Sequence, residues 1–289
     1  MKPYPLDHCV LPTRSLAAAR ARLSALGFTV AADAAHPFGT ANCCVFFEDD
    51  TYLEPLAIVA EDLTAAAIQV GNTFVDRDRH YRAVQGDEGF SAFVLGTADA
   101  DADHARFVGE GVSAGSILSF SRPFVDAHGV QGEASFKLAF AAPIHSEVFF
   151  FTCERVKSPS ADRATLQRHR NGVIGISHVL LTASRPGDYE NFLSLFCGIE
   201  PLRRDAGPVE FAMANATVSL IPPALASALD MDGSGGLGLS GITFLTQYLP
   251  DVRGALAAAE IHHEVRERRI VVPPAVGQGA TFIFEEFQV

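Results

Sequence analysis

Short apolar runs alternate with amphipathic stretches along the chain, and this pattern predicts a mixed fold of strands and helices. The first unit of the pattern comprises a strand at 6–11, a helix at about 15–26 and strands at 28–30, 41–47 and 51–58. Gly27 ends the predicted helix, because glycine tolerates the left-handed backbone that commonly follows a helix. The acidic segment 48–50 supplies the turn of a hairpin. The unit therefore has the order strand, helix, three strands.

The same order recurs further along the chain. The later units are predicted to begin with strands at 90–95, 176–181 and 242–245, followed by helices at about 99–108, 186–196 and 250–260. Further strands are expected near 116–120, 134–140, 147–153, 211–214, 216–221, 263–267 and 281–287. Gly27, Gly111 and Gly198 end the first three helices at nearly equal distances after the first strand of each unit. We therefore predict an α+β fold of four βαβββ modules, with four unrelated units in one α+β fold as the alternative.

Two connecting segments differ in composition from these units. The stretch 154–170 is polar and contains the sequence Lys-Ser-Pro-Ser, which is typical of a linker between domains. It divides the chain into a domain at 1–155 and a second domain at 171–289. The charged stretch 61–86 either covers a pocket of the first domain or links its two modules.

Composition narrows the range of functions. Hydrophobic residues make up 48% of the 289 residues and charged residues 19%, which excludes a disordered chain and a coiled coil. The net charge of -12 argues against binding to the phosphate backbone of nucleic acids. No apolar run approaches the ~18 residues of a membrane span, and the first residues lack the apolar core of a secretory signal. We therefore expect a cytoplasmic monomer or homodimer that binds a small molecule, with neither nucleic acid nor membrane as partner.

The five cysteines are odd in number and form no CxxC pair. Most of them lie inside apolar runs, where a thiol behaves as a small hydrophobic side chain. We therefore predict reduced thiols in the core rather than zinc ligands or a redox pair.

Two polar side chains interrupt the apolar strands of the first unit. His8 lies in its first strand and Glu54 in its last strand, each between apolar neighbours. A buried carboxylate is unfavourable unless a cation or hydrogen bonds compensate it. Imidazole nitrogen and carboxylate oxygen are also good ligands for divalent ions. The two side chains converge if these strands are neighbours; a core histidine bonded to the backbone and a solvated glutamate are the alternatives.

A second group of polar residues stands just before a strand. Pro37 and Gly39 shape a tight loop that carries His36 and leads to Asn42. Histidine transfers protons near neutral pH, and asparagine offers donors and an acceptor to a substrate oxygen. The alternative is a loop held together by its own side-chain hydrogen bonds. Arg122 is a further candidate, either for an anionic group of a substrate or for a surface role.

These residues resemble the glyoxalase-like domain family of the vicinal oxygen chelate superfamily. The resemblance is carried by Asp7-His8, by the loop 36–42 and by the run Thr51-Tyr52-Leu53-Glu54. It implies paired βαβββ modules that form a curled sheet around a cavity. It also implies that His8 and Glu54 bind a divalent ion (Zn, Fe, Mn, Ni or Mg), which chelates neighbouring oxygens of a substrate and stabilises an oxyanion.

The chain departs from the pattern of this family. Members that bind metal take ligands from both modules of a pair, yet Ala92 stands where His8 stands in the first module. The strand at 148–151 has no carboxylate at the position that matches Glu54. The first pair of modules therefore supplies two ligands, or three if His36 takes part, and two are too few for a tight zinc site.

The second half shows a weaker version of the same pattern. His178 matches His8, but Leu220 falls where a glutamate is expected and Thr243 replaces the second histidine. Glu285 lies in the last strand and gives a second, weaker pair of metal ligands with His178. A core histidine and an exposed glutamate are the alternative.

Two functions follow from this resemblance. The first is a glyoxalase-like small-molecule enzyme of isomerase, lyase or dioxygenase type that acts on a substrate with neighbouring oxygens. In such an enzyme Glu54 serves as general base and His36 as a second catalytic residue, while Asn42 and Arg122 bind the substrate. The second is a non-catalytic binding protein of the same fold that sequesters an apolar small molecule such as an antibiotic.

Overall fold

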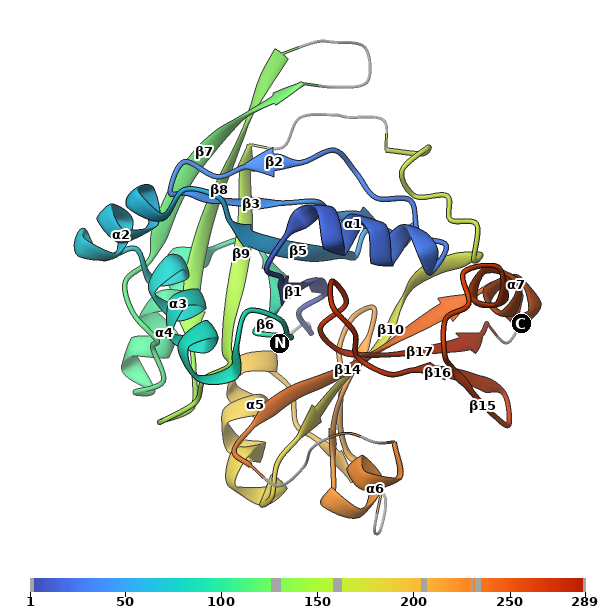
Figure 1. Ribbon diagram of the computed structural model, residues 1–289. Helices are drawn as coiled ribbons and strands as arrows, with labels where there is room; N and C mark the ends of the chain where they lie inside the picture. The colour runs from blue at the N-terminus through green and yellow to red at the C-terminus, as the bar shows by residue number, and fades with distance from the viewer. Residues whose placement is uncertain are drawn as a thin grey trace.

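The computed structural model describes residues 3–125, 131–157, 163–203, 207–229, 231 and 235–287. Its strands form two sheets (Figure 1). The first sheet contains β1 (Leu6–Pro12), β2 (Ala34–Ala35), β3 (Thr40–Asn42), β4 (Val45–Phe46), β5 (Tyr52–Ile58), β6 (Ala92–Thr97), β7 (Leu118–Val125), β8 (Gln131–Ala141) and β9 (Phe149–Lys157). The second contains β10 (Val173–Thr182), β11 (Leu202–Arg203), β12 (Val209–Ala212), β13 (Thr217–Ile221), β14 (Gly238–Thr246), β15 (Glu264–Arg266), β16 (Arg269–Val272) and β17 (Thr281–Glu286).

The helices lie between and beside these sheets. They are α1 (Leu16–Ala25), α2 (Glu61–Gln69), α3 (Thr73–Gln85), α4 (Ala100–Gly109), the 3-10 helix η1 (Pro186–Tyr189), α5 (Glu190–Cys197), α6 (Pro223–Ala228) and α7 (Leu249–Ala258). None of the helices in the described ranges is long and apolar enough to cross a membrane. The α+β class predicted from the sequence is confirmed.

Both sheets share one strand arrangement. In the first, β1 pairs antiparallel with β6, and each is flanked by a parallel neighbour, β5 and β9 respectively. In the second, β10 pairs antiparallel with β14, flanked in parallel by β13 and β17. Figure 1 shows the first sheet curling from β2 round to β7. The curled sheet implied by the family resemblance is therefore present. The first and last strands of the first unit are neighbours, which is the condition for His8 and Glu54 to converge.

Local signals begin and end the helices as expected. Ser15 caps α1 by accepting a hydrogen bond from the Ala18 amide. Gly27 follows the helix with φ +94°, a conformation that only glycine adopts at little cost. A Cβ at Gly27 would lie 2.9 Å from the Cβ of Asn171, so this glycine also permits the second half of the chain to pack closely on α1.

The strand predicted at 28–30 is absent, and this prediction is wrong. The Thr29 amide donates to Nδ1 of His169, and its hydroxyl donates to the carbonyl oxygen of Arg168. These partners lie in the connection between the two halves, so the segment does not pair with a neighbouring strand. Phe28 is buried among aromatic rings of the second sheet, including Phe244 and Phe284. Its apolar character thus reflects packing between the sheets rather than strand pairing.

One continuous core joins the two halves. It contains side chains from one face of each sheet, such as Phe93 and Phe244, together with residues of the helices, such as Leu23 and Phe196. The five cysteines are all buried and free, as the sequence predicts. The opposite, concave face of the first sheet carries a separate cluster that includes Phe74 of α3.

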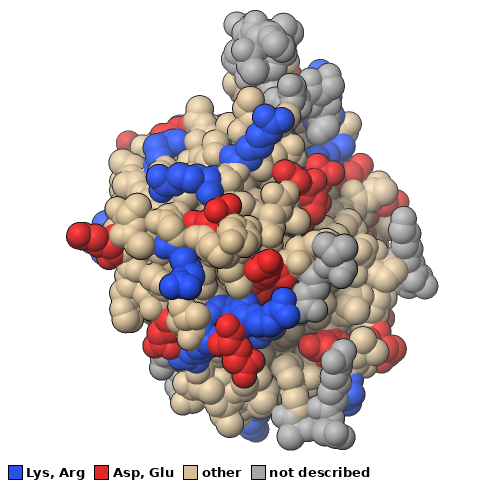
Figure 2. Space-filling model, turned by 90° about the vertical axis from the view of Figure 1, so that its right-hand side faces the viewer, with Lys and Arg blue, Asp and Glu red and all other residues tan. Residues whose placement is uncertain are grey.

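The concave faces of the two sheets are covered differently. In the second sheet, Ala226 of α6 and Met231 pack against Leu180, Val271 and Ile283. In the first sheet, α3 covers only part of the concave face and leaves a cavity beside β1 and β5. The charged stretch 61–86 thus forms α2 and α3, and Phe74 of α3 lines this cavity. On the face shown in Figure 2, acidic and basic side chains are interspersed.

Candidate functional site

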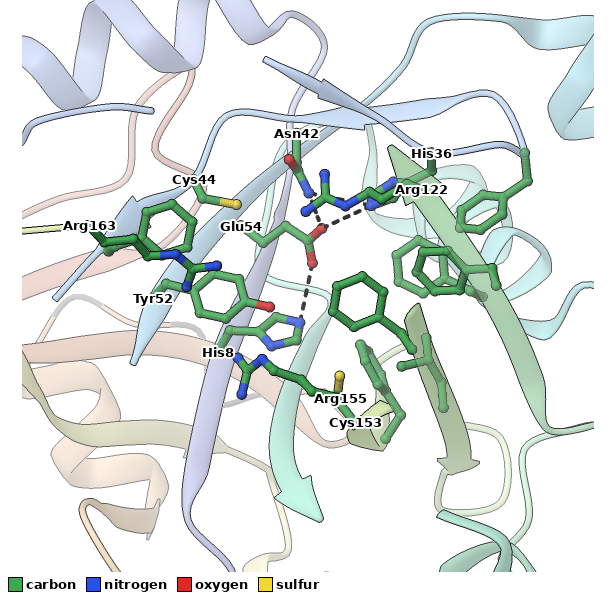
Figure 3. Close-up of a pocket in the computed structure, with 17 residues that line it drawn as sticks. His8, His36, Asn42, Cys44, Tyr52, Glu54, Arg122, Cys153, Arg155 and Arg163 are labelled. Atoms are coloured by element: carbon green, nitrogen blue, oxygen red, sulfur yellow. Dashed lines mark hydrogen bonds and ion pairs between the residues drawn. The ribbon is translucent and has the colours of Figure 1, made fainter. Parts of the chain in front are cut away.

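A cavity of about 70 Å³ lies in the concave face of the first sheet. This is room for about five water molecules or a small flat ligand group. Its lining combines aromatic rings with a few polar groups: His8, His36, Phe38, Asn42, Cys44, Phe46, Tyr52, Glu54, Phe74, Phe120, Arg122, Phe136, Leu138, Phe151, Cys153, Arg155 and Arg163 (Figure 3). Apolar walls with a small number of converging polar groups are typical of small-molecule sites.

Glu54 is the centre of the polar cluster. Because β1 and β5 pair in parallel, its side chain emerges on the same face as that of His8. Nε2 of His8 lies 3.2 Å from Oε2 of Glu54, and the side-chain amide of Asn42 donates to Oε1 at 2.6 Å. All three residues are buried. Strands β1, β3 and β5 thus hold a carboxylate between an imidazole and an amide, as the dashed lines in Figure 3 show.

The other nitrogen of His8 is held by a second buried carboxylate. Nδ1 of His8 lies 2.6 Å from Oδ1 of Asp7. Arg155 of β9 pairs with both oxygens of Asp7, at 2.9 and 2.6 Å. The His8 ring also stacks on Tyr52, with centroids 4.4 Å apart. These contacts fix the ring plane, so Nε2 is directed at Glu54.

His36 approaches the same carboxylate from the loop before β3. Its Nδ1 lies 2.9 Å from the hydroxyl oxygen of Thr40, and its Nε2 lies 3.7 Å from Oε1 of Glu54. The ring stacks on Phe38 at 5.1 Å between centroids. The loop is therefore held by its own side chains, as one reading of the sequence suggested, and it still presents an imidazole to the cavity.

Burial and pairing give the three titratable groups different charges. Burial alone would raise the pKa of Glu54, but the hydrogen bond and charge of His8, the charge of His36 and the Asn42 amide together lower it to about 2. Burial disfavours a charged His8, yet its hydrogen bonds to Asp7 and Glu54 raise its pKa. Burial lowers the pKa of His36 to about 4, although the charge of Glu54 opposes this. The site therefore pairs an ionised Glu54 with His8, whose protonated form is favoured, beside a His36 that is neutral at pH 7.

Most of the predicted site residues meet in this cavity. His8, His36, Asn42 and Glu54 form one hydrogen-bonded cluster, and Arg122 of β7 lines the same space. Among the phenylalanines of these strands and of the loop before β3, Phe38, Phe46 and Phe151 reach the cavity. Phe47 and Phe150 belong to the core between the sheets, because strand alternation points them to the other face.

Three contributors to the site were not predicted. Asp7 is adjacent to His8 in the sequence, but nothing in the pattern showed that a cation would balance it. Arg155 falls in the predicted linker 154–170, but the structure corrects the start of that linker, because β9 continues to Lys157. Arg155 follows the predicted strand by two residues and shares the face of Cys153, so strand alternation is a signal for it. Arg163 lies in the segment interpreted as a linker, which carries no such signal.

His178 and Glu285, the weaker pair predicted in the second half, lie in a more exposed position than His8 and Glu54. Nδ1 of His178 is 3.7 Å from Oε1 of Glu285, and the Ser177 hydroxyl donates to that carboxylate at 2.9 Å. Arg269 also pairs with Glu285. Both members of the pair are partly exposed, and α6 with Met231 fills the neighbouring concave face. A ligand role for these two residues stays a prediction.

The donors of the first cavity do not complete a metal site. Catalytic metal ions are held by about three protein ligands, and a ligating histidine must be neutral. Nε2 of His8 is already paired with Glu54, while Ala92 and Phe151 stand on the strands across the sheet. No group of three or more His, Cys, Asp or Glu side chains in the described ranges is arranged to hold a metal ion. Metal binding by His8 and Glu54 stays a prediction.

Solved structures share this fold over nearly the whole chain. A hypothetical protein from Staphylococcus aureus matches with a TM-score of 0.63 at 13% identity, over 98% of this chain and 99% of that one. A mutant of 4-hydroxymandelate synthase from Streptomyces coelicolor matches with a TM-score of 0.62 at 14% identity, over 99% and 93%. The Mn(II)-bound glyoxalase from Novosphingobium aromaticivorans matches with a TM-score of 0.55 at 12% identity, over 99% and 82%.

The sequence matches one known protein family. Among curated proteins, none matches this sequence. The glyoxalase-like domain family matches residues 6–195, which include every residue of the cavity described above. The chain therefore belongs to the glyoxalase-like domain family.

Proposed function

We propose that this protein is a glyoxalase-like small-molecule enzyme of isomerase or lyase type, which moves a proton next to a substrate oxygen. The observation that supports it most strongly is the pair of His8 and Glu54, buried in the wall of a cavity rich in aromatic rings. Burying two charges costs several kcal/mol per ion, and a hydrophobic pair of similar volume is often at least as stable. Such a pair at the wall of a cavity marks a candidate for chemistry.

The charges of this pair suit an enolisation. A substrate with a carbonyl oxygen at Nε2 of His8 and an acidic C–H bond at Glu54 would separate the two groups. Glu54 then loses the partner that lowers its pKa and becomes a stronger base. The C–H electrons move into the carbonyl group, Glu54 takes the proton from carbon, and His8 gives its proton to the oxygen. The step turns a charged pair into a neutral pair, and it needs no external co-reactant.

The surrounding residues support each of these roles. Asp7, itself bound by Arg155, holds Nδ1 of His8 and keeps Nε2 directed at the reacting oxygen. Asn42 fixes one oxygen of Glu54. Neutral His36 lies close enough to Glu54 to pass the proton on to a second position of the substrate, which an isomerisation requires.

The incomplete donor set favours a second candidate, a binding protein that sequesters an apolar ligand. Ala92 and the aromatic wall stand where a second set of ligands would be needed. In that case the ion pair serves to orient the ligand, and no bond to hydrogen is broken.

Exchange of substrate hydrogen with solvent deuterium distinguishes these functions. The probes are 2-hydroxyacetophenone and phenylpyruvate, which combine an aromatic ring with acidic C–H bonds beside a carbonyl group. We expect the protein, stripped of metal by EDTA, to accelerate exchange, and Glu54→Gln and His8→Ala to reduce the rate by about 10²–10⁴-fold.

His178→Ala is the matched control, because it removes the equivalent histidine of the second half and leaves the cavity unchanged. Exchange that survives in Glu54→Gln would contradict the role of this carboxylate. Exchange that is lost with EDTA and returns with a divalent ion would support the metal prediction instead. Thermal stabilisation by both probes without any exchange would support the binding protein.

A further inference from the structure

Two arginines of the cavity have no acidic partner. Of the three guanidinium groups that line it, Arg155 is paired with Asp7. Arg122 stacks over the Phe136 ring and Arg163 over the Phe46 ring, at 5.8 and 4.4 Å from the ring centroids. Neither makes an ion pair within the part of the chain that the structure describes. Both are therefore free to pair with a ligand.

The two guanidinium groups face the same space. Figure 3 shows Arg163 entering the cavity from one side and Arg122 from the other, with Cys44 and Glu54 between them in the view. Both arginines line the same cavity as Cys44. Arg122 comes from β7, whereas Arg163 comes from the connection between the two sheets.

The described part of that connection, from residue 163 onwards, is hydrogen-bonded to residues beside the site. Gln167 donates from its side-chain amide to the carbonyl oxygen of Phe47 at 2.8 Å. Nε2 of His169 lies 3.0 Å from the carbonyl oxygen of Phe46, the residue on which Arg163 stacks. Of this segment Arg163 lines the cavity. Its backbone carbonyl oxygen accepts from the amides of Leu166 and Gln167, and its guanidinium group stacks on Phe46, so its neighbours hold it in place.

The charge balance of the cavity indicates the ligand. The charges of Glu54 and Asp7 are compensated within the cluster, by His8 and Arg155 respectively. Arg122 and Arg163 are thus uncompensated cations in a protein whose net charge is -12. Such a local excess in an aromatic cavity attracts an anion, and guanidinium groups match the geometry of a carboxylate.

We infer that the substrate is an aromatic carboxylate whose carboxylate group is held between Arg122 and Arg163. This inference rests on the function proposed above and adds the substrate class to it. The aromatic body then lies against the phenylalanine rings, and its oxygen-bearing carbon reaches His8 and Glu54.

Binding of three probes that share one ring tests this assignment without reference to catalysis. They are phenylacetate, its neutral isostere phenylacetamide, and phenyl phosphate, measured by isothermal titration calorimetry. We expect phenylacetate to bind at least about tenfold more tightly than the amide. Arg122→Gln and Arg163→Gln should each weaken phenylacetate about tenfold and leave the amide unchanged. Arg79→Gln, on an exposed arginine of α3, is the matched control and should change neither affinity.

Other binding results would exclude the inference or change the class of ligand. Equal binding of carboxylate and amide, or equal weakening of both by the arginine substitutions, would overturn the inference and leave the proposed function standing. Tighter binding of phenyl phosphate would show that the site takes a phosphate ester instead. If none of the three binds, the inference fails, whereas the proposed function stands or falls with the deuterium-exchange assay.

Discussion

Replacing Glu54 by glutamine removes one charge of the buried ion pair while keeping the shape of the side chain. Glu54 is 6% exposed, and its pKa falls from 4.5 to about 2 because His8, His36 and Asn42 stabilise the carboxylate. A shift of one pKa unit corresponds to ~1.4 kcal/mol, so the ionised form contributes about 3 kcal/mol to folding. We expect Glu54→Gln to lower the free energy of unfolding by about this amount at pH 7, in agreement with the ~3–5 kcal/mol cost of breaking buried pairs.

The loss should depend on pH with a defined sign. A carboxyl group whose pKa is lowered by folding stabilises the protein above its unfolded pKa, and this contribution disappears as pH falls towards the folded pKa. The difference between the wild type and Glu54→Gln should therefore be full above about pH 5 and shrink towards pH 2. The raised pKa of His8 belongs to the same interaction and is not added to it.

Urea denaturation of both proteins at pH 7, 5, 4 and 3, followed by circular dichroism, measures this difference. Glu48→Gln is the matched control, since it makes the same change on an exposed side chain six positions before Glu54. The control should lie within about 0.5 kcal/mol of the wild type at each pH. A loss in Glu54→Gln that stays constant from pH 7 to pH 3, or no loss at all, would refute the assignment of a buried ion pair.

Three further predictions concern the neighbouring structure. In imidazole NMR titrations, His36 should remain neutral down to about pH 4, whereas His8 should be protonated at pH 7; titration of His36 near 6.5 would contradict its burial. Phe151→Ala should lower the free energy of unfolding, measured by urea denaturation, by about 3–5 kcal/mol, because the ring is 1% exposed and packs against His8. A loss under about 1 kcal/mol would show that neighbouring side chains relax into the space left by the ring. Gly27→Ala should destabilise the protein by about 1–3 kcal/mol more than Gly111→Ala. Both glycines have positive φ, but a Cβ at Gly27 meets Asn171 whereas the space at Gly111 is open, so equal losses would argue against close packing of the two halves.

Strand pairing within the first unit could be anticipated, because it depends on local order. A strand, a helix of limited length and a short return place β1 beside β5, and alternation then puts His8 and Glu54 on one face. The segment at 28–30 shows where the same reasoning fails. Phe28 has the apolar character of a strand residue, yet it packs against Phe244 of the second sheet, a contact that no local pattern indicates.

The division of the chain illustrates a similar limit. The composition of 154–170 indicates a linker between domains at 1–155 and 171–289, and that division stays a prediction. In the structure its last residues are tied to Phe46 and Phe47, and the two sheets share one core. Polar composition predicts exposure to solvent, but it does not show which backbone groups the polar side chains bind.

The sequence by itself determined the order and type of most elements, the positions where helices end, and the candidates His8, His36, Asn42, Glu54 and Arg122. These features follow from periodicity and from residues whose conformational preferences act locally. The tertiary structure alone decided which charges meet: that Asp7 and Arg155 hold His8, that Glu54 is ionised, and that Arg163 closes the cavity. Electrostatic interactions depend on distance and burial, and both are set by contacts between residues that lie far apart in the chain.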